Sequence, residues 1–143
     1  MIALARSRAT SEPGGAEMPS VSKEDTANRE FVEGIIDSRS EEFGDQTVSF
    51  NAFMSDLDPA PFFKGLRDDR CQCPHWGYVV AGRLTYRFAD HEETYEAGEA
   101  YFVPPGHVPL LHAGSECIEF SPTTELKETA DMLRKNMEAS QQG

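Results

Sequence analysis

The sequence predicts an all-β domain, a sandwich or barrel of short strands, followed by a single C-terminal helix. Apolar and polar residues alternate in short runs over most of the chain, and turn residues interrupt these runs roughly every eight to twelve positions. After Pro122 the apolar spacing changes to every third or fourth residue, which is typical of a helix. A length of 143 residues with 38% hydrophobic residues is enough for one domain with a single core.

Residues 1–27 precede the predicted strands and are rich in serine, proline, glycine and charged residues. Segments of this composition bury too little apolar surface to fold, so we expect a disordered tail. Residues 30–43 are ambiguous, because their apolar residues fit one stripe of a short helix while Gly34 fits an edge strand. We therefore place the β domain at residues 28–122 and leave the secondary structure of its first part open.

From residue 46 onward most of the predicted strands are separated by turn residues such as glycine, proline and aspartate. The expected strands are 47–53, 78–81, 84–88, 92–95, 100–103, 108–111 and 116–120. Thr123 or Thr124 can cap a helix that continues through Met137 and defines the C-terminal segment, residues 123–143. Because this helix carries an apolar stripe, we expect it to pack on the outside of the barrel or on a partner subunit.

The charge balance narrows the classes of partner. Thirteen lysines and arginines stand against 25 aspartates and glutamates, which makes the net charge -12. Such a chain repels nucleic acids and anionic membrane surfaces, so we expect a small-molecule ligand or substrate instead. No apolar run reaches the roughly 20 residues of a membrane span, and the first residues do not continue into a signal-peptide pattern. Three cysteines, an odd number, favour a reducing and therefore cytoplasmic location.

The strongest chemical signal lies at Cys71-Gln72-Cys73-Pro74-His75, where two thiols and an imidazole occupy every second position. If this segment is extended, alternation places Cys71, Cys73 and His75 on one face of a strand. Thiolate and imidazole together suit zinc better than the other common metal ions. The sequence therefore predicts a metal site, with zinc or another divalent ion as the cofactor.

Two motifs that follow resemble those of the cupin superfamily. Residues 78–82, Tyr-Val-Val-Ala-Gly, resemble the strand and turn of the first cupin motif, and Gly98, Pro104 and Gly106 match the spacing of the second. The resemblance covers roughly residues 46–121. It implies a jelly-roll-like cupin β-barrel between the tail and the C-terminal helix, and a homodimer, which is common among cupins. Because cupins share a fold more than an activity, the resemblance implies no single reaction.

The metal ligands usual in cupins are replaced at their positions in this chain. The first motif usually carries two histidines and a glutamate, and counting back from Gly82 puts Cys71 on the second histidine and His75 on the glutamate. The histidine of the second motif falls on Pro109, and His107 lies two residues before it. We therefore do not expect the usual centre of three histidines and one glutamate.

Two interpretations of these cysteines and histidines stay open. In the first, Cys71, Cys73 and His75 bind a metal together with a fourth ligand, which is His107 or, in its place, His112. In the second, both cysteines are small buried residues and His75 is a hydrogen-bonded residue of a pocket. Elemental analysis of the protein distinguishes the two.

Metal binding favours an enzyme that acts on a small organic molecule in the barrel. Thiolate ligands argue against an oxygen-activating iron centre, so we expect non-redox chemistry of the lyase, isomerase, hydrolase or cyclase type. In this hypothesis His75, Tyr78 and Glu116 are the catalytic residues, and the last two assist proton transfer. The alternatives are a non-enzymatic ligand-binding or sensory module, and a metal-independent enzyme with His75 or His107 as its acid or base.

Overall fold

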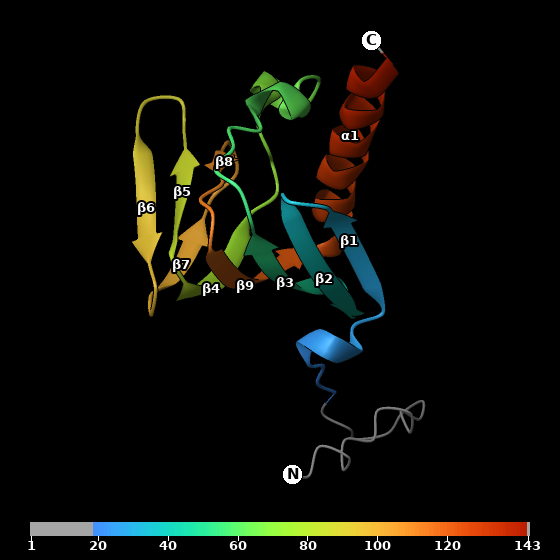
Figure 1. The fold of residues 1–143 in the computed structure, drawn as a ribbon, viewed down its shortest axis with the longest axis vertical. Helices are drawn as coiled ribbons and strands as arrows, with labels where there is room; N and C mark the ends of the chain where they lie inside the picture. Colours follow the sequence, from blue (N-terminus) through green and yellow to red (C-terminus); the bar gives the residue numbers. More distant parts are fainter. Residues whose placement is uncertain (1–18, 143) are drawn as a thin grey trace.

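The computed structural model describes residues 19–142. Residues 1–18 lie outside the described part, and with them most of the tail predicted for residues 1–27. Before the first strand, the described residues contain one turn of 3-10 helix, η3 (Lys23–Asp25), which lies below the larger sheet in Figure 1.

Nine strands in residues 19–142 form two antiparallel sheets (Figure 1). The larger sheet has the strand order β1-β2-β3-β9-β4-β7, and the smaller has the order β6-β5-β8. The larger sheet consists of β1 (Asn28–Val32), β2 (Ile36–Phe43), β3 (Gln46–Phe53), β4 (His75–Ala81), β7 (Ala100–Val103) and β9 (Ser115–Pro122). The smaller sheet consists of β5 (Arg83–Arg87), β6 (Glu92–Glu96) and β8 (Val108–Leu110). Two 3-10 helices, η4 (Ala60–Phe63) and η5 (Arg67–Asp69), connect β3 to β4. Every strand expected after residue 46 is present.

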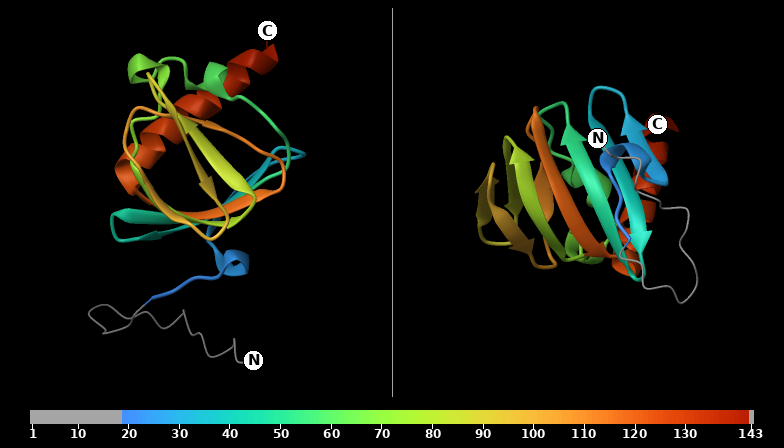
Figure 2. Two further views of the ribbon diagram at one scale, coloured as in Figure 1. Left: turned by 90° about the vertical axis from the view of Figure 1, so that its left-hand side faces the viewer. Right: turned by 90° about the horizontal axis from the view of Figure 1, so that it is seen from below.

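The two sheets face each other across the core, as the left view of Figure 2 shows. Within residues 19–142 they do not join into one hydrogen-bonded ring, so the architecture is an open jelly-roll-like sandwich and not a closed barrel. The chain passes from one sheet to the other at Gly82, where φ is +70° and a Cβ would lie 2.8 Å from the Cα of Ser115. Only glycine combines this backbone conformation with this close approach.

The segment that the sequence leaves open, residues 30–43, is extended. β1 and β2 pair in an antiparallel hairpin that places Val32 opposite Ile36. Gly34 lies in the turn between them with φ of +76°, a conformation that ends any helical stripe at this point and reverses the chain. The strand interpretation is therefore the correct one.

Side chains on the central strands alternate between the core and the outer surface. In β9 every second side chain is buried, in the order Ser115, Cys117, Glu119 and Ser121. The apolar core between the sheets consists of Val79, Leu84, Tyr86, Tyr101, Val103 and Cys117. The inner face of the larger sheet therefore carries a carboxylate and hydroxyls as well as apolar groups.

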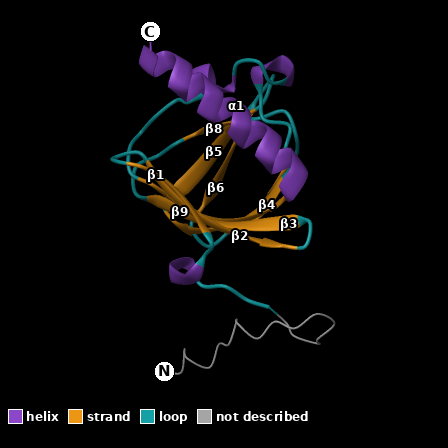
Figure 3. Cartoon of the chain, turned by 90° about the vertical axis from the view of Figure 1, so that its right-hand side faces the viewer, coloured by secondary structure: helices purple, strands orange, loops and turns teal. Residues whose placement is uncertain are grey.

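Helix α1 (Thr123–Gln142) follows β9 directly and lies on the side of the larger sheet opposite η3 (Figure 3). Leu126 and Leu133 of its inner face pack against the cluster of Phe63, Cys71, Cys73 and Val108. Asn136 fastens the helix to the η4 region by donating hydrogen bonds to the carbonyls of Phe62 (2.7 Å) and Lys64 (2.8 Å). The helix thus covers one end of the sandwich with its apolar stripe.

No helix within residues 19–142 is long and apolar enough to cross a membrane.

Candidate metal centre

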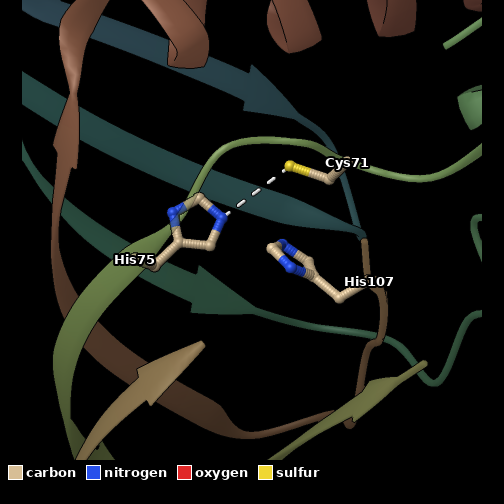
Figure 4. A group of neighbouring side chains, drawn as sticks. All are labelled: Cys71, His75 and His107. Atoms are coloured by element: carbon tan, nitrogen blue, oxygen red, sulfur yellow. Dashed lines mark hydrogen bonds between the residues drawn. The ribbon is translucent and has the colours of Figure 1, made fainter. Parts of the chain in front are cut away.

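Three of the four predicted metal ligands come together at one end of the sandwich. Cys71, His75 and His107 each offer one ligand atom, and these atoms lie within 4.8 Å of one another. Their side chains point toward a common centre, as Figure 4 shows. All three residues are buried, with exposed fractions of 3%, 7% and 1%. A group of this kind, drawn from two segments that are far apart in the sequence, is a candidate metal centre.

The backbone holds Cys71 and His107 side by side through an isolated β-bridge. The amide of Cys71 donates to the carbonyl of His107 at 2.8 Å, and the amides of Gly106 and His107 donate to the carbonyl of Cys71 at 2.8 and 3.3 Å. His75 is the first residue of β4, four positions after Cys71. Each ligand therefore sits where a loop meets the sheet framework, fixed by main-chain hydrogen bonds or by strand pairing.

Both imidazole rings are oriented by their Nδ1 atoms. His75 Nδ1 is hydrogen-bonded to the hydroxyl of Ser121 at 2.8 Å, and His107 Nδ1 lies 2.7 Å from the carbonyl of Pro104. A carbonyl only accepts, so Nδ1 of His107 carries the proton and Nε2 carries the lone pair of the neutral ring. That Nε2 is buried and has no hydrogen-bond partner in the described structure. The lone pair of this Nε2 atom is thus available to a bound metal ion or hydrogen-bond donor.

Cys71 is surrounded by groups that favour its thiolate form. Burial raises the pKa of this thiol, but the imidazoles of His107 and His75 lower it by more, to about 6. The Sγ atom lies 3.9 Å from Nε2 of His75, and it accepts the backbone N–H of Cys73 at 3.4 Å. Thr129 of α1 contributes a hydroxyl at 3.5 Å from the same sulfur. Cys71 is therefore a thiolate at neutral pH, the form that binds metals.

Glu119 on β9 is the charged neighbour of His75. Its Oε1 lies 3.7 Å from His75 Nδ1, while its Oε2 accepts hydrogen bonds from Tyr86 at 2.5 Å and Tyr101 at 2.6 Å. Burial lowers the pKa of His75, but the charge of Glu119 and the sulfur of Cys71 raise it well above its usual value. Burial and the charge of Glu119 raise the pKa of both tyrosines, which therefore stay protonated and donate.

The geometry and chemistry of the three side chains fit a metal ion such as zinc. A thiolate and an imidazole bound tetrahedrally to one zinc ion would lie about 3.6 Å apart, given the usual Zn–S and Zn–N bond lengths. The Cys71–His75 separation of 3.9 Å is close to this value. Both histidines also have their second nitrogen held by a hydrogen bond, which is the usual arrangement of metal-binding imidazoles. The unpartnered Nε2 of His107 is the feature that a metal would satisfy most directly.

The fourth predicted ligand, Cys73, lies outside this group of ligand atoms. Its Sγ is 3.4 Å from the carbonyl of Pro74 and 3.9 Å from that of Pro122, and burial raises the pKa of its thiol. The expected alternation of Cys71, Cys73 and His75 requires an extended strand, but β4 begins only at His75. The chain before β4 therefore brings Cys71 back toward His75 and leaves Cys73 against the backbone.

Tyr78 and Glu116, predicted to assist proton transfer, belong to the outer surface. Tyr78 follows His75 by an odd number of positions on β4, so it points away from the cluster and is 46% exposed. Glu116 lies between two buried residues of β9 and faces outward for the same reason. His112, the alternative ligand, is hydrogen-bonded through Nε2 to Thr85 at 2.9 Å and is not in the group. These three residues, expected at the site, therefore lie away from the candidate metal centre.

Sequence reasoning missed the polar residues that surround the cluster, namely Glu119, Ser121, Tyr86, Tyr101 and Thr129. Two of them share the inner face of β9 with Cys117, a member of the apolar core. If Cys117 is taken as buried, alternation places Glu119 and Ser121 inward and Glu116 outward. This was the signal that could have identified Glu119. The hydroxyl of Thr129 comes from a helix whose docking position the sequence does not specify.

Comparisons with family models and with curated proteins found no match for this chain. Solved structures do match. An RmlC-like cupin from Shewanella frigidimarina has a TM-score of 0.53 and 17% identity, over 75% of this chain and 92% of the other. The polyketide cyclase RemF from Streptomyces resistomycificus has a TM-score of 0.52 and 17% identity, over 75% and 80% of the two chains. A protein of unknown function from Rhizobium leguminosarum has a TM-score of 0.51 and 16% identity, over 74% and 96%.

The chain is therefore a protein of cupin fold, as the resemblance of its two glycine motifs implies. At these identities the likeness concerns the fold and not the reaction.

Proposed function

We propose that this chain is an enzyme that holds one zinc ion on Cys71, His75 and His107 and carries out non-redox chemistry on a small organic molecule. The buried and unpartnered Nε2 of His107, aimed at the same centre as Cys71 and His75, is the observation that carries the proposal. When bound by three protein ligands, zinc supplies a Lewis acid or lowers the pKa of a water molecule in its open position.

The residues around the ligands support this proposal by their own chemistry. Ser121 and Glu119 hold Nδ1 of His75, and the carbonyl of Pro104 holds Nδ1 of His107, so each ring presents Nε2 to the centre. Glu119 also holds the two tyrosine hydroxyls beside His75. We assign proton handling at this site to Glu119 with Tyr86 and Tyr101, in place of Tyr78 and Glu116.

Elemental analysis of tag-free protein, prepared without added metal, tests the proposal. We expect about one zinc per chain in the wild type and very little in Cys71→Ser. Cys73→Ser is the matched control, because Cys73 is also a buried cysteine but lies outside the group, and it should keep its metal. A wild type with well below one equivalent, or equal metal loss in both variants, contradicts the proposal.

A second candidate is metal-independent acid–base catalysis by His75. It is supported by the contact between Glu119 and Nδ1 of His75, together with Nε2 of the same ring near the Cys71 thiol. A carboxylate that orients an imidazole beside a nucleophile is a recurring catalytic arrangement. A cyclisation, the reaction class of the polyketide cyclase RemF of similar fold, is one reaction that this second candidate would include.

Thermal shift measurements against a panel of metabolites, with and without EDTA, separate these candidates. Stabilisation that disappears with EDTA and in Cys71→Ser supports the metal enzyme. Stabilisation that persists in EDTA and is lost in His75→Gln supports the second candidate. Stabilisation that persists in EDTA and in both variants favours the remaining possibility, a ligand-binding or sensory protein without a catalytic metal.

We further propose that the chain acts as a homodimer in the cytoplasm, with a small molecule as its ligand. The net charge of -12 supports the absence of nucleic-acid binding, because it repels phosphate groups.

A further inference from the structure

Helix α1 directs a buried hydroxyl group at the sulfur of Cys71. Thr129, which carries this hydroxyl, is only 6% exposed. It lies three positions after Leu126 and four before Leu133, so these three residues share one face of the helix. The two leucines pack against the cluster that contains Cys71 and Cys73. Within the described chain, the hydroxyl has the sulfur of Cys71 as its hydrogen-bond partner, at 3.5 Å.

Threonine is not the residue that packing alone would favour at this position. It has a lower helix propensity than leucine or alanine, and a buried hydroxyl costs free energy unless it is hydrogen-bonded. A threonine within a helix often satisfies its hydroxyl on the carbonyl four residues earlier, but here the hydroxyl is paired with the sulfur. The presence of Thr129 on this apolar face is therefore explained by Cys71 and not by the helix itself.

The direction of this hydrogen bond follows from the chemistry of a metal ligand. A cysteine binds a metal as its thiolate, which has no proton to donate. The hydroxyl of Thr129 therefore donates and the sulfur accepts, as it also does from the backbone N–H of Cys73 at 3.4 Å. Of these two donors, the hydroxyl is the one that a substitution can remove.

We infer that Thr129 is a positioning residue of the metal centre, whose hydrogen bond to Cys71 couples the docking of α1 to metal occupancy. This inference rests on the metal ion proposed above. Groups that hydrogen-bond to a metal ligand fix its orientation and tune its electron donation. An ion that holds the sulfur in one position also lowers the entropy cost of this hydrogen bond, so metal binding should hold α1 more firmly.

Cobalt(II) added to metal-free protein tests the hydrogen bond, because the thiolate-to-cobalt charge-transfer absorption reports on the ligating sulfur. Thr129→Val removes the hydroxyl at nearly constant volume and should move this absorption to longer wavelength, since a sulfur without the hydrogen bond gives up its electrons more easily. Thr129→Ser keeps a hydroxyl and should restore the wild-type absorption. Zinc affinity should fall about tenfold in Thr129→Val and much less in Thr129→Ser.

Thr124→Val is the matched control, because it makes the same change in the same helix at an exposed threonine. It should leave the charge-transfer absorption and the zinc affinity unchanged. If Thr129→Val is poorly folded by circular dichroism, Thr129→Ala removes the same hydroxyl with a better helix former and should move the absorption in the same direction.

Hydrogen exchange with and without saturating zinc tests the coupling to α1. In the wild type, zinc should slow the exchange of α1 amides about fivefold or more, and in Thr129→Val this effect should largely disappear. Amides of β9 are the internal reference, because they report on the overall stability that zinc confers on both proteins.

The outcomes separate a failure of the metal site from a failure of this coupling. A wild type without any thiolate-to-cobalt absorption contradicts the metal site, and the role of Thr129 with it. A wild type that shows the absorption, with Thr129→Val indistinguishable from it, overturns the role of Thr129 alone. A shift that Thr129→Ser does not restore also overturns it, because the change then reflects packing. Equal protection of α1 by zinc in the wild type and in Thr129→Val overturns the coupling.

Discussion

His107 shows how a single buried nitrogen constrains the chemistry of this protein. The carbonyl of Pro104 determines which ring nitrogen carries the proton, and burial removes water from the other. A buried polar atom without a partner costs about 1–3 kcal/mol, so such an atom on a ring already oriented toward two further ligands calls for a functional explanation. The proposed metal ion would provide that explanation, because it would accept the lone pair of a neutral imidazole.

Metal binding should release about one proton per ion at a pH near 7.5. With a pKa of about 6, Cys71 has already lost its proton, whereas His75 holds one because its pKa is raised well above the usual value. When Nδ1 of His107 donates to the carbonyl of Pro104, Nε2 of the same ring presents its lone pair. Calorimetric titration of metal-free protein with zinc, in two buffers that differ in ionisation enthalpy, measures the number released.

The number of protons should change with pH in a defined direction. As pH falls through about 6, Cys71 becomes protonated, so the number released should rise toward two and the apparent affinity should fall more steeply. As pH rises through the pKa of His75, the number should fall toward zero. A release of zero or two protons near pH 7.5 contradicts these protonation states.

Glu119→Gln should change both the proton count and the affinity. Loss of the carboxylate charge lowers the pKa of His75, so fewer protons should be released near pH 7.5. The amide is also a weaker partner for the histidine, and groups of this kind typically change metal affinity by about 10- to 100-fold. Zinc affinity at high pH, where protons no longer compete, measures this second effect.

Glu116→Gln is the control for Glu119→Gln, because Glu116 lies three residues earlier in β9 and on the opposite face. It should leave proton release and affinity unchanged. A comparable effect of both substitutions would indicate that only the overall charge of the protein matters.

For the individual elements, the sequence predicts where each strand lies more completely than it predicts which side of the strand is buried. Alternation and turn residues indicate where β3 through β9 lie, and Gly34 explains why residues 30–43 pair as strands. The face of a strand depends on its register, and one position of error exchanges buried for exposed residues. An error in the assigned face explains why Glu116 was predicted at the site, whereas Glu119 is the residue that contacts His75.

The ligand group was predictable only in part, because two of its members, Cys71 and His107, lie outside the regular strands. The clustering of Cys71 and His75 and the position of His107 after Gly106 indicate three ligands. The position of Cys73 depends on the path of the chain before β4, which alternation does not describe. The contribution of α1 depends on tertiary packing, and no local pattern reveals which of its residues meets the thiol.

Helix α1 covers Cys71. We expect the hydrogen bonds of Asn136 to determine how strongly this helix is attached to the rest of the domain. Asn136→Ala removes two hydrogen bonds to the η4 region and should lower the free energy of unfolding by about 1–2 kcal/mol. Because Thr129 of the same helix contacts the sulfur, a loosened helix should also let a thiol reagent alkylate Cys71 faster. Mass spectrometry of metal-free protein, with the modified cysteine identified, measures that rate.

Ser140→Ala is the matched control for Asn136→Ala. The Ser140 hydroxyl donates only to Met137 within the helix, so its loss should affect neither stability nor alkylation appreciably. If Asn136→Ala lowers stability but leaves alkylation unchanged, the reagent reaches Cys71 by a path that α1 does not cover.

At the scale of the whole molecule, the two faces of the larger sheet present different kinds of side chain. Its inner face places Glu119 and Ser121 beside His75, and its outer face carries the exposed aromatic residues Trp76, Phe102 and Phe120. Alternation along β4 alone produces this division, with His75 on one side and Trp76 on the other. Substitutions on one face should therefore have little effect on the property that belongs to the other.

Removing the metal with a chelator tests how much the proposed ion stabilises the entire fold. The three ligands lie before β4, at its first residue and before β8, so an ion that binds them joins segments far apart in the sequence. A ligand present at about 1,000 times its dissociation constant stabilises the folded state by about 4 kcal/mol. For a chain of this size, its removal corresponds to a fall in the thermal midpoint of roughly 10 °C.

We therefore expect EDTA to lower the thermal midpoint of the wild type and of Cys73→Ser by this amount, and to have almost no effect on Cys71→Ser, which has no bound ion to lose. Phe102→Lys should respond to EDTA as the wild type does, whatever its oligomeric state, because its substitution lies on the outer face. Differential scanning calorimetry of the four proteins provides the comparison. An equal response to EDTA in Cys71→Ser and in the wild type would place any metal elsewhere, since the ion would then be bound without its only thiolate ligand.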